Sequence, residues 1–148
     1  LVELARRMPG YIGFYNGVNA GASIPGHLHF QFCKRPEDEP EFPLERAARL
    51  HFETGEENLH LRNYPMDVAL WKGSAEDVLQ RASKWIKGWA EKNHPRIHDL
   101  TANFIVSSEK SGEEVTLFFI PRDRVATNGR RTGRAFAGLT CNWSDTPA

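Results

Sequence analysis

The sequence predicts an α+β fold with a mainly antiparallel sheet, and three observations lead to that class. Short runs rich in aromatic and β-branched residues recur along the chain, as they do in strands. Two other segments carry apolar residues at helical spacing. Residues 101–107 and 114–120 are strand-like and are joined by residues 109–112 (EKSG), which predicts a β-hairpin. The expected order is β-β-α-β-β-α-β-β, and such runs of strands favour antiparallel pairing.

The N-terminal third is expected to contain the end of a helix and two strands. Residues 1–8 are helix-like, and the pair Pro9 and Gly10 stops them. Residues 11–15 (YIGFY) predict a short strand. After a loop rich in Gly, Ala and Asn, residues 27–33 alternate strictly and predict a second strand antiparallel to the first.

The middle of the chain is expected to hold two helices and further short strands. Pro43 opens a helix (PLERAARL), because a proline in the first turn costs no hydrogen bond. Residues 51–62 alternate in part and predict one or two short strands, and residues 67–72 predict another. A longer helix follows Ser74 as its N-cap and runs to about Asn93. One face of it should be buried by Val78, Leu79, Ala82, Trp85, Ile86 and Trp89.

The bulk composition points to an ordinary globular domain. We interpret residues 1–148 as a single domain, and the start at Leu1, without a methionine, suggests an excised piece of a longer protein. Nineteen basic residues balance nineteen acidic ones, so no global charge draws the chain to nucleic acid or to a membrane. No apolar run approaches the roughly 20 residues that span a bilayer. The two cysteines, Cys33 and Cys141, form no zinc-type pair, and a reducing, cytoplasmic setting is expected.

The segment His27-Leu-His-Phe-Gln31 carries the most chemical information. Alternate residues of a strand share one face, so His27, His29 and Gln31 should project together. Leu28, Phe30 and Phe32 should then point the other way, into a core. The strand therefore presents two imidazoles and an amide to one substrate-sized region.

Metal binding is one interpretation of this face, because neutral imidazoles of a His-x-His strand can converge on one ion. A metal site also needs a third protein ligand, and the sequence does not supply one at the expected position. Cys33 and Lys34 occupy the positions beyond His29 where a cupin-like site would place a glutamate. Remote ligands remain open among the other four histidines of the chain: His51, His60, His94 and His98.

Covalent catalysis on phosphorus is the second interpretation. An imidazole nitrogen can attack a phosphoryl group and later leave as a neutral amine. The preceding Gly/Ala/Ser loop offers backbone N–H groups and the Ser23 hydroxyl to phosphate oxygens, since glycine permits close approach. Gln31 and the second histidine could donate to the developing charge. The plainest alternative is a half-exposed polar strand after a simple turn.

Residues 16–31 (NGVNAGASIPGHLHFQ) resemble the active-site segment of the histidine triad superfamily. More narrowly, they resemble the branch with diadenosine tetraphosphate phosphorylase, GDP-L-galactose phosphorylase and galactose-1-phosphate uridylyltransferase. In that branch an asparagine and a small-residue loop with serine precede His-x-His-x-Gln. Residues 41–48 (EFPLERAA) and the runs TANFIVSSE and TLFFIPRDR (116–124) are also similar to these enzymes. One departure is Gly26, which stands where such phosphorylases often carry Asp.

The resemblance implies a twisted antiparallel sheet of the histidine-triad type, with helices packed on one face. It implies a nucleotidyltransferase in which His29 becomes nucleotidylated, Gln31 bonds the attacked phosphate and His27 supports the site. Substrate-binding residues expected from it are Asn16, Asn19, Gly21, Ser23 and, after the last strand, Arg122. No cofactor and no metal are expected.

The expected substrate is a dinucleoside polyphosphate or a nucleoside-diphosphate sugar, with phosphate or a sugar phosphate as acceptor. Neither nucleic acid nor a membrane is an expected partner, and a homodimer is a candidate assembly. Two further functions stay open at this point: a hydrolase with water as acceptor, and a non-catalytic nucleotide-binding module.

Overall fold

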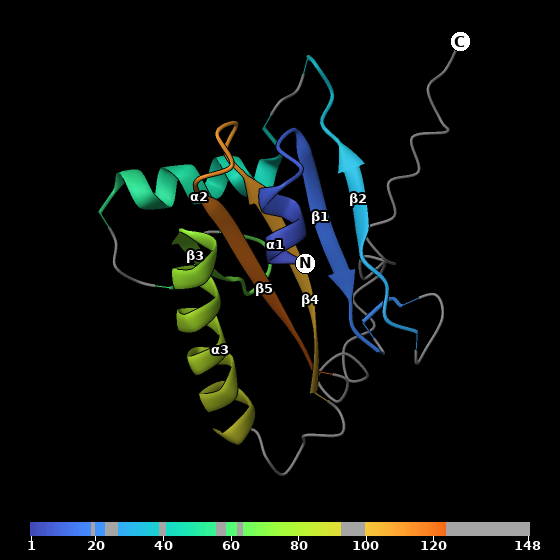
Figure 1. Cartoon of the computed structure of the whole chain (residues 1–148). Helices are drawn as coiled ribbons and strands as arrows, with labels where there is room; N and C mark the ends of the chain where they lie inside the picture. The colour runs from blue at the N-terminus through green and yellow to red at the C-terminus, as the bar shows by residue number, and fades with distance from the viewer. Residues whose placement is uncertain are drawn as a thin grey trace.

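In the part of the chain that the structure describes, five antiparallel strands form one sheet, which three helices cover. A computed structural model describes residues 1–18, 20–22, 27–38, 41–55, 59–61, 64–92 and 100–123. The elements in chain order are α1 (Val2–Arg6), β1 (Tyr11–Asn16), β2 (Gln31–Lys34), α2 (Pro43–Glu53), β3 (Ala69–Gly73), α3 (Ala75–Lys92), β4 (Leu100–Ser108) and β5 (Val115–Asp123). Within the sheet the strand order is β2-β1-β4-β5-β3 (Figure 1). The α+β class and the antiparallel sheet are therefore confirmed.

The predicted hairpin is the centre of the sheet. β4 and β5 pair from Leu100↔Asp123 to Ser108↔Val115, and β1 joins the other edge of β4. The predicted N-cap is also confirmed, because the backbone N–H of Asp77 donates to Ser74 Oγ at 3.3 Å. These features are local in sequence, and local turn and cap chemistry is sufficient to specify them.

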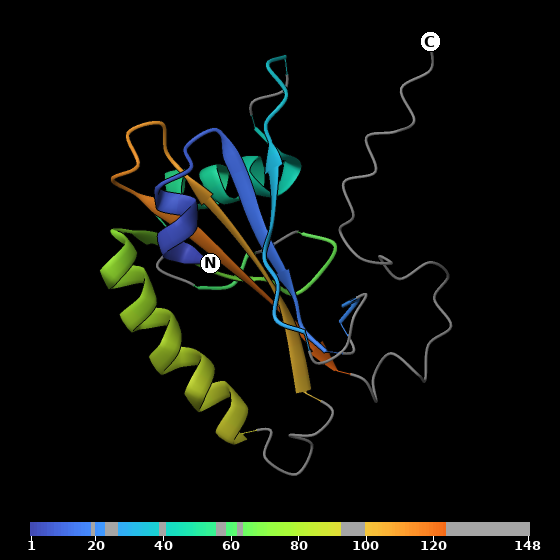
Figure 2. The ribbon, with the colours of Figure 1, turned by 45° about the vertical axis from the view of Figure 1, so that its right-hand side comes forward.

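Helices lie on both faces of the sheet, which corrects the expectation that they pack on one face. α1 and α3 cover one side (Figure 2), and α2 passes behind the strands on the other (Figure 1). The reason is that successive residues in the middle of the two central strands are apolar and buried, namely Ile105 and Val106 in β4 and residues 117–120 (LFFI) in β5. Phe118 packs on the α2 side, whereas Phe119 packs on the α1/α3 side. A strand that is buried on both faces needs two covering layers.

Two strand predictions need correction. Residues 51–53 continue α2, because Leu44, Ala48 and His51 recur at helical spacing and are buried. In the described part of 51–62, pairing is limited to an isolated bridge between His60 and Ala69. The second predicted strand starts at Gln31 rather than at residue 27.

The predicted core is correct at most helix positions and wrong at three apolar side chains. Trp85, Ile86 and Trp89 pack against the core of the α1/α3 side, as expected. Leu79 is 45% exposed, Leu28 70% and Phe30 38%. Leu28 and Phe30 precede β2, so the regular alternation expected for residues 27–33 does not extend to them.

Candidate functional site

A chain of polar side chains crosses four neighbouring strands on the α2 side of the sheet. The Nε of Arg122 in β5 donates to Asn103 Oδ1 at 2.8 Å. Asn103 Nδ2, in β4, donates to Asn16 Oδ1 at 2.6 Å. In turn Asn16 Nδ2, in β1, lies 3.5 Å from Gln31 Oε1 at the start of β2. This network, Arg122–Asn103–Asn16–Gln31, brings together three predicted site residues from distant parts of the sequence.

Strand register explains why these residues meet. Asn16 and Asn103 are cross-strand partners, and Gln31 pairs with Phe14, two residues before Asn16. Alternation then places all of them on the side where Phe14 packs against the α2-side core. Asn16 is 6% exposed and Asn103 only 3%, so water contributes little to satisfying their amides.

The loop after β1 is held against β4. The Gly17 N–H donates to the Ala102 carbonyl at 2.9 Å, and a Cβ at Gly17 would collide with that carbonyl and with the Thr101 hydroxyl. Asn103 Nδ2 also donates to the Ala20 carbonyl at 2.7 Å. Gly21 has a φ of 94°, in the left-handed region that favours glycine. The small residues of this loop thus serve close packing and a special backbone conformation.

The two histidines lie side by side just before β2. Their rings stack with centroids 5.9 Å apart. His29 Nδ1 lies 3.2 Å from the carbonyl oxygen of His27. A carbonyl only accepts hydrogen bonds, so Nδ1 carries the proton in this arrangement. In the neutral ring, His29 Nε2 then holds the lone pair and can act as a nucleophile.

The structure brings together only part of the predicted site. Gln31, Asn16 and Arg122 are connected through the network, and His27 contacts His29. Among the described residues, no hydrogen bond or ring contact joins the histidines to the network. Gly21 is described, whereas Asn19 and Ser23 lie outside the described residues.

Asn103 is the site residue that the sequence interpretation missed. It stands within the apolar run ANFIV of β4, where an amide is unusual in a strand buried on both faces. That single polar residue was a usable signal, but its partners could not be known before the strand register was known. Asn16, its hydrogen-bond partner in β1, is 87 positions away in the sequence.

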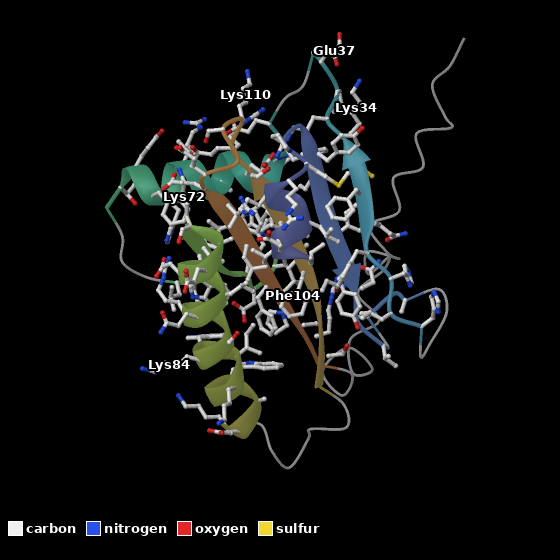
Figure 3. All side chains as sticks on the ribbon, in the orientation of Figure 1. Lys34, Glu37, Lys72, Lys84, Phe104 and Lys110 are labelled. Carbon is white, nitrogen blue, oxygen red and sulfur yellow. The ribbon has the colours of Figure 1, made fainter. Side chains whose placement is uncertain are left out.

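The charges around the site differ from those at the far end of the sheet. No acidic side chain of the described residues pairs with Arg122. By contrast, Lys72 lies 2.7 Å from Glu109 and 3.2 Å from Glu114, near the turn that carries Lys110 (Figure 3). The hydrogen bond to Glu109 raises the pKa of Lys72. The positive charge of Lys72 is therefore balanced by two neighbouring carboxylates, whereas the Arg122 guanidinium can still bind an anion.

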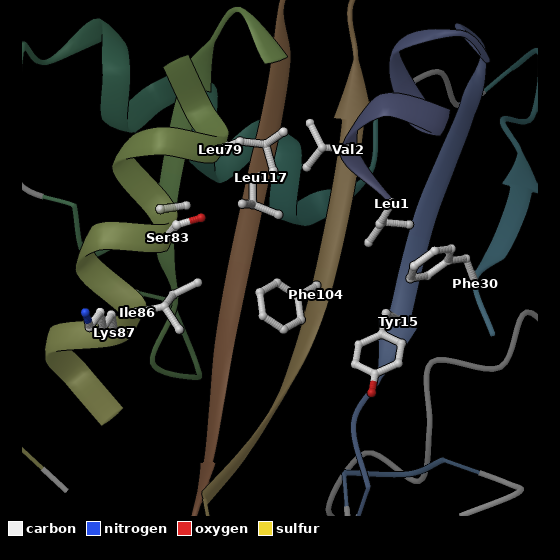
Figure 4. Close-up of a pocket in the computed structure, with 11 residues that line it drawn as sticks. Leu1, Val2, Tyr15, Phe30, Leu79, Ser83, Ile86, Lys87, Phe104 and Leu117 are labelled. Atoms are coloured by element: carbon white, nitrogen blue, oxygen red, sulfur yellow. The ribbon is translucent and has the colours of Figure 1, made fainter. Parts of the chain in front are cut away.

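The opposite face of the sheet carries an apolar pocket of about 510 Å³. Tyr15, Phe30 and Phe104 line it together with Leu79 and Ile86 of α3 (Figure 4). Tyr15 and Phe30 meet edge to face at 6.0 Å. The pocket and the polar network thus occupy opposite sides of the same strands.

The described residues also bear on two other kinds of site. Within the described ranges, no group of three or more His, Cys, Asp or Glu side chains is arranged to hold a metal ion. His94 and His98, two of the remote candidates, lie outside those ranges. No helix in the described part of the chain is long and apolar enough to cross a membrane.

Comparison with known families adds one match. A family model described as a domain of unknown function, DUF4922, matches residues 1–34. That stretch contains α1, β1, the loop and the His-x-His-x-Gln segment, and it ends with β2. No curated protein and no solved structure matches the chain. The match carries no activity with it, so the chemistry of the site rests on its geometry.

Proposed function

We propose that this chain is a nucleotidyltransferase of the phosphorylase type, related to the histidine triad enzymes, which works through a nucleotidyl-His29 intermediate. The substrate is a dinucleoside polyphosphate or a nucleoside-diphosphate sugar. The acceptor is phosphate or a sugar phosphate.

The observation that carries the proposal is the contact that His29 makes through its Nδ1. Its Nδ1 is committed to the His27 carbonyl at 3.2 Å, which leaves the Nε2 lone pair for attack on phosphorus. His29 lies two residues before Gln31, whose amide is tied to Asn16 and through it to the network. Transfer of a phosphoryl-type group requires a nucleophile together with hydrogen-bond donors to the phosphate oxygens, and Gln31 and Arg122 are the donors proposed for that role.

The reaction balances as two displacements. In the first, His29 Nε2 attacks one phosphorus of the pyrophosphate linkage, a P–N bond forms and the bridging P–O bond breaks. The leaving group departs as a nucleotide anion from a dinucleoside polyphosphate, or as a sugar-phosphate anion from a nucleoside-diphosphate sugar. In the second, an oxygen of the acceptor phosphate attacks the same phosphorus, a P–O bond forms, and the P–N electron pair returns to Nε2. A phosphate acceptor already carries an anionic oxygen, so no general base is needed in this step.

Intact-protein mass spectrometry tests the proposal directly. The purified chain is incubated with a panel of dinucleoside polyphosphates and nucleoside-diphosphate sugars. We expect a mass increase of one nucleoside monophosphate in the wild type and none in His29→Asn, because asparagine has no basic ring nitrogen. Adding inorganic phosphate should discharge the adduct as a nucleoside diphosphate.

His60→Asn is the matched control. His60 forms a bridge to Ala69 of β3, at the opposite edge of the sheet from β2, and its Nδ1 lies 3.3 Å from Asp67 Oδ1. This variant should form the adduct like the wild type. An adduct that persists in His29→Asn, or its absence from the wild type across the panel, would refute the proposal. Release of only the nucleoside monophosphate, whether or not phosphate is present, would indicate a hydrolase.

A further inference from the structure

The hydrogen bonds of the network have a fixed direction. A guanidinium only donates, so Asn103 Oδ1 must face Arg122. A backbone carbonyl only accepts, so Asn103 Nδ2 must face Ala20. Both ends of the Asn103 amide are therefore assigned by partners that cannot reverse their roles.

This direction continues to Gln31. Asn103 Nδ2 donates to Asn16 Oδ1, which leaves Asn16 Nδ2 to donate to Gln31 Oε1. With its oxygen turned towards Asn16, Gln31 keeps the hydrogens of its own amide nitrogen for another acceptor. Phosphate oxygens are acceptors, so this is the polarity that a phosphate-binding site needs.

Asn103 also orients Arg122. Its Nε is bound to Asn103, which leaves the outer edge of the guanidinium without an acidic partner among the described residues. Arg122 and Asn103 are both on the α2 side, with Asn103 almost fully buried. A fixed guanidinium fork recognises phosphate better than a mobile cation does.

We propose that Asn103 is the positioning residue of this site, and that it orients Gln31 and Arg122 together as donors to phosphate oxygens of the substrate. The ligand class that follows is a pyrophosphate-containing molecule. This inference rests on the proposed function for its substrate class, but it concerns binding and does not require the covalent step.

Calorimetric titration with inorganic pyrophosphate tests it without catalysis. The wild type should bind, and Asn103→Leu should weaken binding by about tenfold or more, as expected when a charge-assisted hydrogen bond loses its geometry. The double variant Gln31→Leu/Arg122→Met should bind more weakly still. Adding Asn103→Leu to that double variant should cause no further loss, since a positioning residue has nothing left to position.

Two controls separate this role from a general effect on charge or folding. Lys72→Met removes a cation from the same face of the sheet, roughly 20 Å along β5 from Arg122 at the usual rise per residue, and should leave pyrophosphate binding unchanged. If Asn103→Leu does not fold, Asn103→Asp replaces it. The aspartate keeps the acceptor for Arg122 but cannot donate to Asn16 or Ala20, so binding should again fall by about tenfold or more.

Three results would overturn the inference: no pyrophosphate binding by the wild type, wild-type affinity in both Asn103 variants, or a further loss when Asn103→Leu is added to the double variant. The proposed function fails separately. Pyrophosphate binding with the expected variant pattern, but no adduct from any nucleotide, would refute the covalent chemistry alone. Adduct formation in the wild type, with equal affinity in all Asn103 variants, would refute the positioning role alone.

Discussion

Glycine is favourable for stability at position 21 and unfavourable at position 88. Gly21 lies in the loop after β1 with a φ of 94°, a conformation that costs other residues about 1–2 kcal/mol. Gly88 lies inside α3, and a Cβ added there would meet nothing within 4 Å. In a helix interior glycine is less favourable than alanine by about 1 kcal/mol.

We therefore expect Gly21→Ala to lower the free energy of unfolding by about 1 kcal/mol, and Gly88→Ala to raise it by up to about 1 kcal/mol. Urea denaturation followed by circular dichroism measures both. Only Gly21→Ala should also weaken pyrophosphate binding, because it alone changes the loop that is held to Asn103 through Ala20. If Gly21→Ala raised the free energy of unfolding as much as Gly88→Ala does, the backbone conformation at Gly21 would tolerate a side chain and the prediction would be wrong.

At the scale of elements, a partly buried ion pair adds to the apolar packing that attaches α2 to the sheet. Arg35, one residue after β2, forms a two-bond ion pair with Glu45 in the first turn of α2. The side chains are 14% and 12% exposed. Glu45 also accepts from the backbone N–H of Phe42 at 3.0 Å, and the Arg35 guanidinium lies over the Phe42 ring. The edge strand and the helix start are thus connected through Glu45.

Glu45→Gln should lower the free energy of unfolding by about 2–3 kcal/mol, because it removes the carboxylate charge that forms two hydrogen bonds with a largely buried guanidinium. Glu53→Gln is the matched control in the same helix. Its partner Arg49 is four residues away and both side chains are about half exposed, so we expect a loss of at most about 0.5 kcal/mol. Denaturant titrations of the two variants give the comparison, and similar losses would mean that the Arg35–Glu45 pair is as weak as a surface pair.

For the whole molecule, the loss of stability at acidic pH follows from three carboxyl groups in different parts of the chain, those of Glu3, Glu41 and Glu109. Hydrogen bonds from Arg6 and Arg7 lower the pKa of Glu3 from 4.5 to about 2. A hydrogen bond from Arg49 lowers the pKa of Glu41, and one from Lys72 lowers that of Glu109. Each group binds a proton more weakly in the folded chain than in the unfolded chain. Their contributions are therefore complete above the ordinary carboxyl pKa and disappear as the pH falls through the folded values.

We expect the free energy of unfolding to decrease as the pH falls below about 4.5 and to continue decreasing towards pH 2. Lys72→Met should make this decrease shallower, since the pKa of Glu109 then returns towards its ordinary value. Urea titrations at a series of acidic pH values measure both curves. A stability that stays constant or rises over this range would contradict the prediction, as would an unchanged slope in Lys72→Met.

Local physical chemistry determined much of this protein in advance. The α+β class, the β4–β5 hairpin, the N-cap at Ser74 and the helix start at Pro43 depend on residues a few positions apart, so they could be predicted from the sequence. The same is true of Gln31 and Asn16 as polar strand residues before and after the small-residue loop.

Only the tertiary structure decided which faces are covered and how the site is joined. Helices lie on both sides of the sheet because β4 and β5 are buried on both faces, which a list of apolar residues does not reveal. Asn103 connects Arg122, Asn16 and the loop at Ala20 across 19 to 87 positions of sequence. Such contacts exist only once strand register is set, and register depends on the simultaneous burial of several side chains that are far apart in the chain.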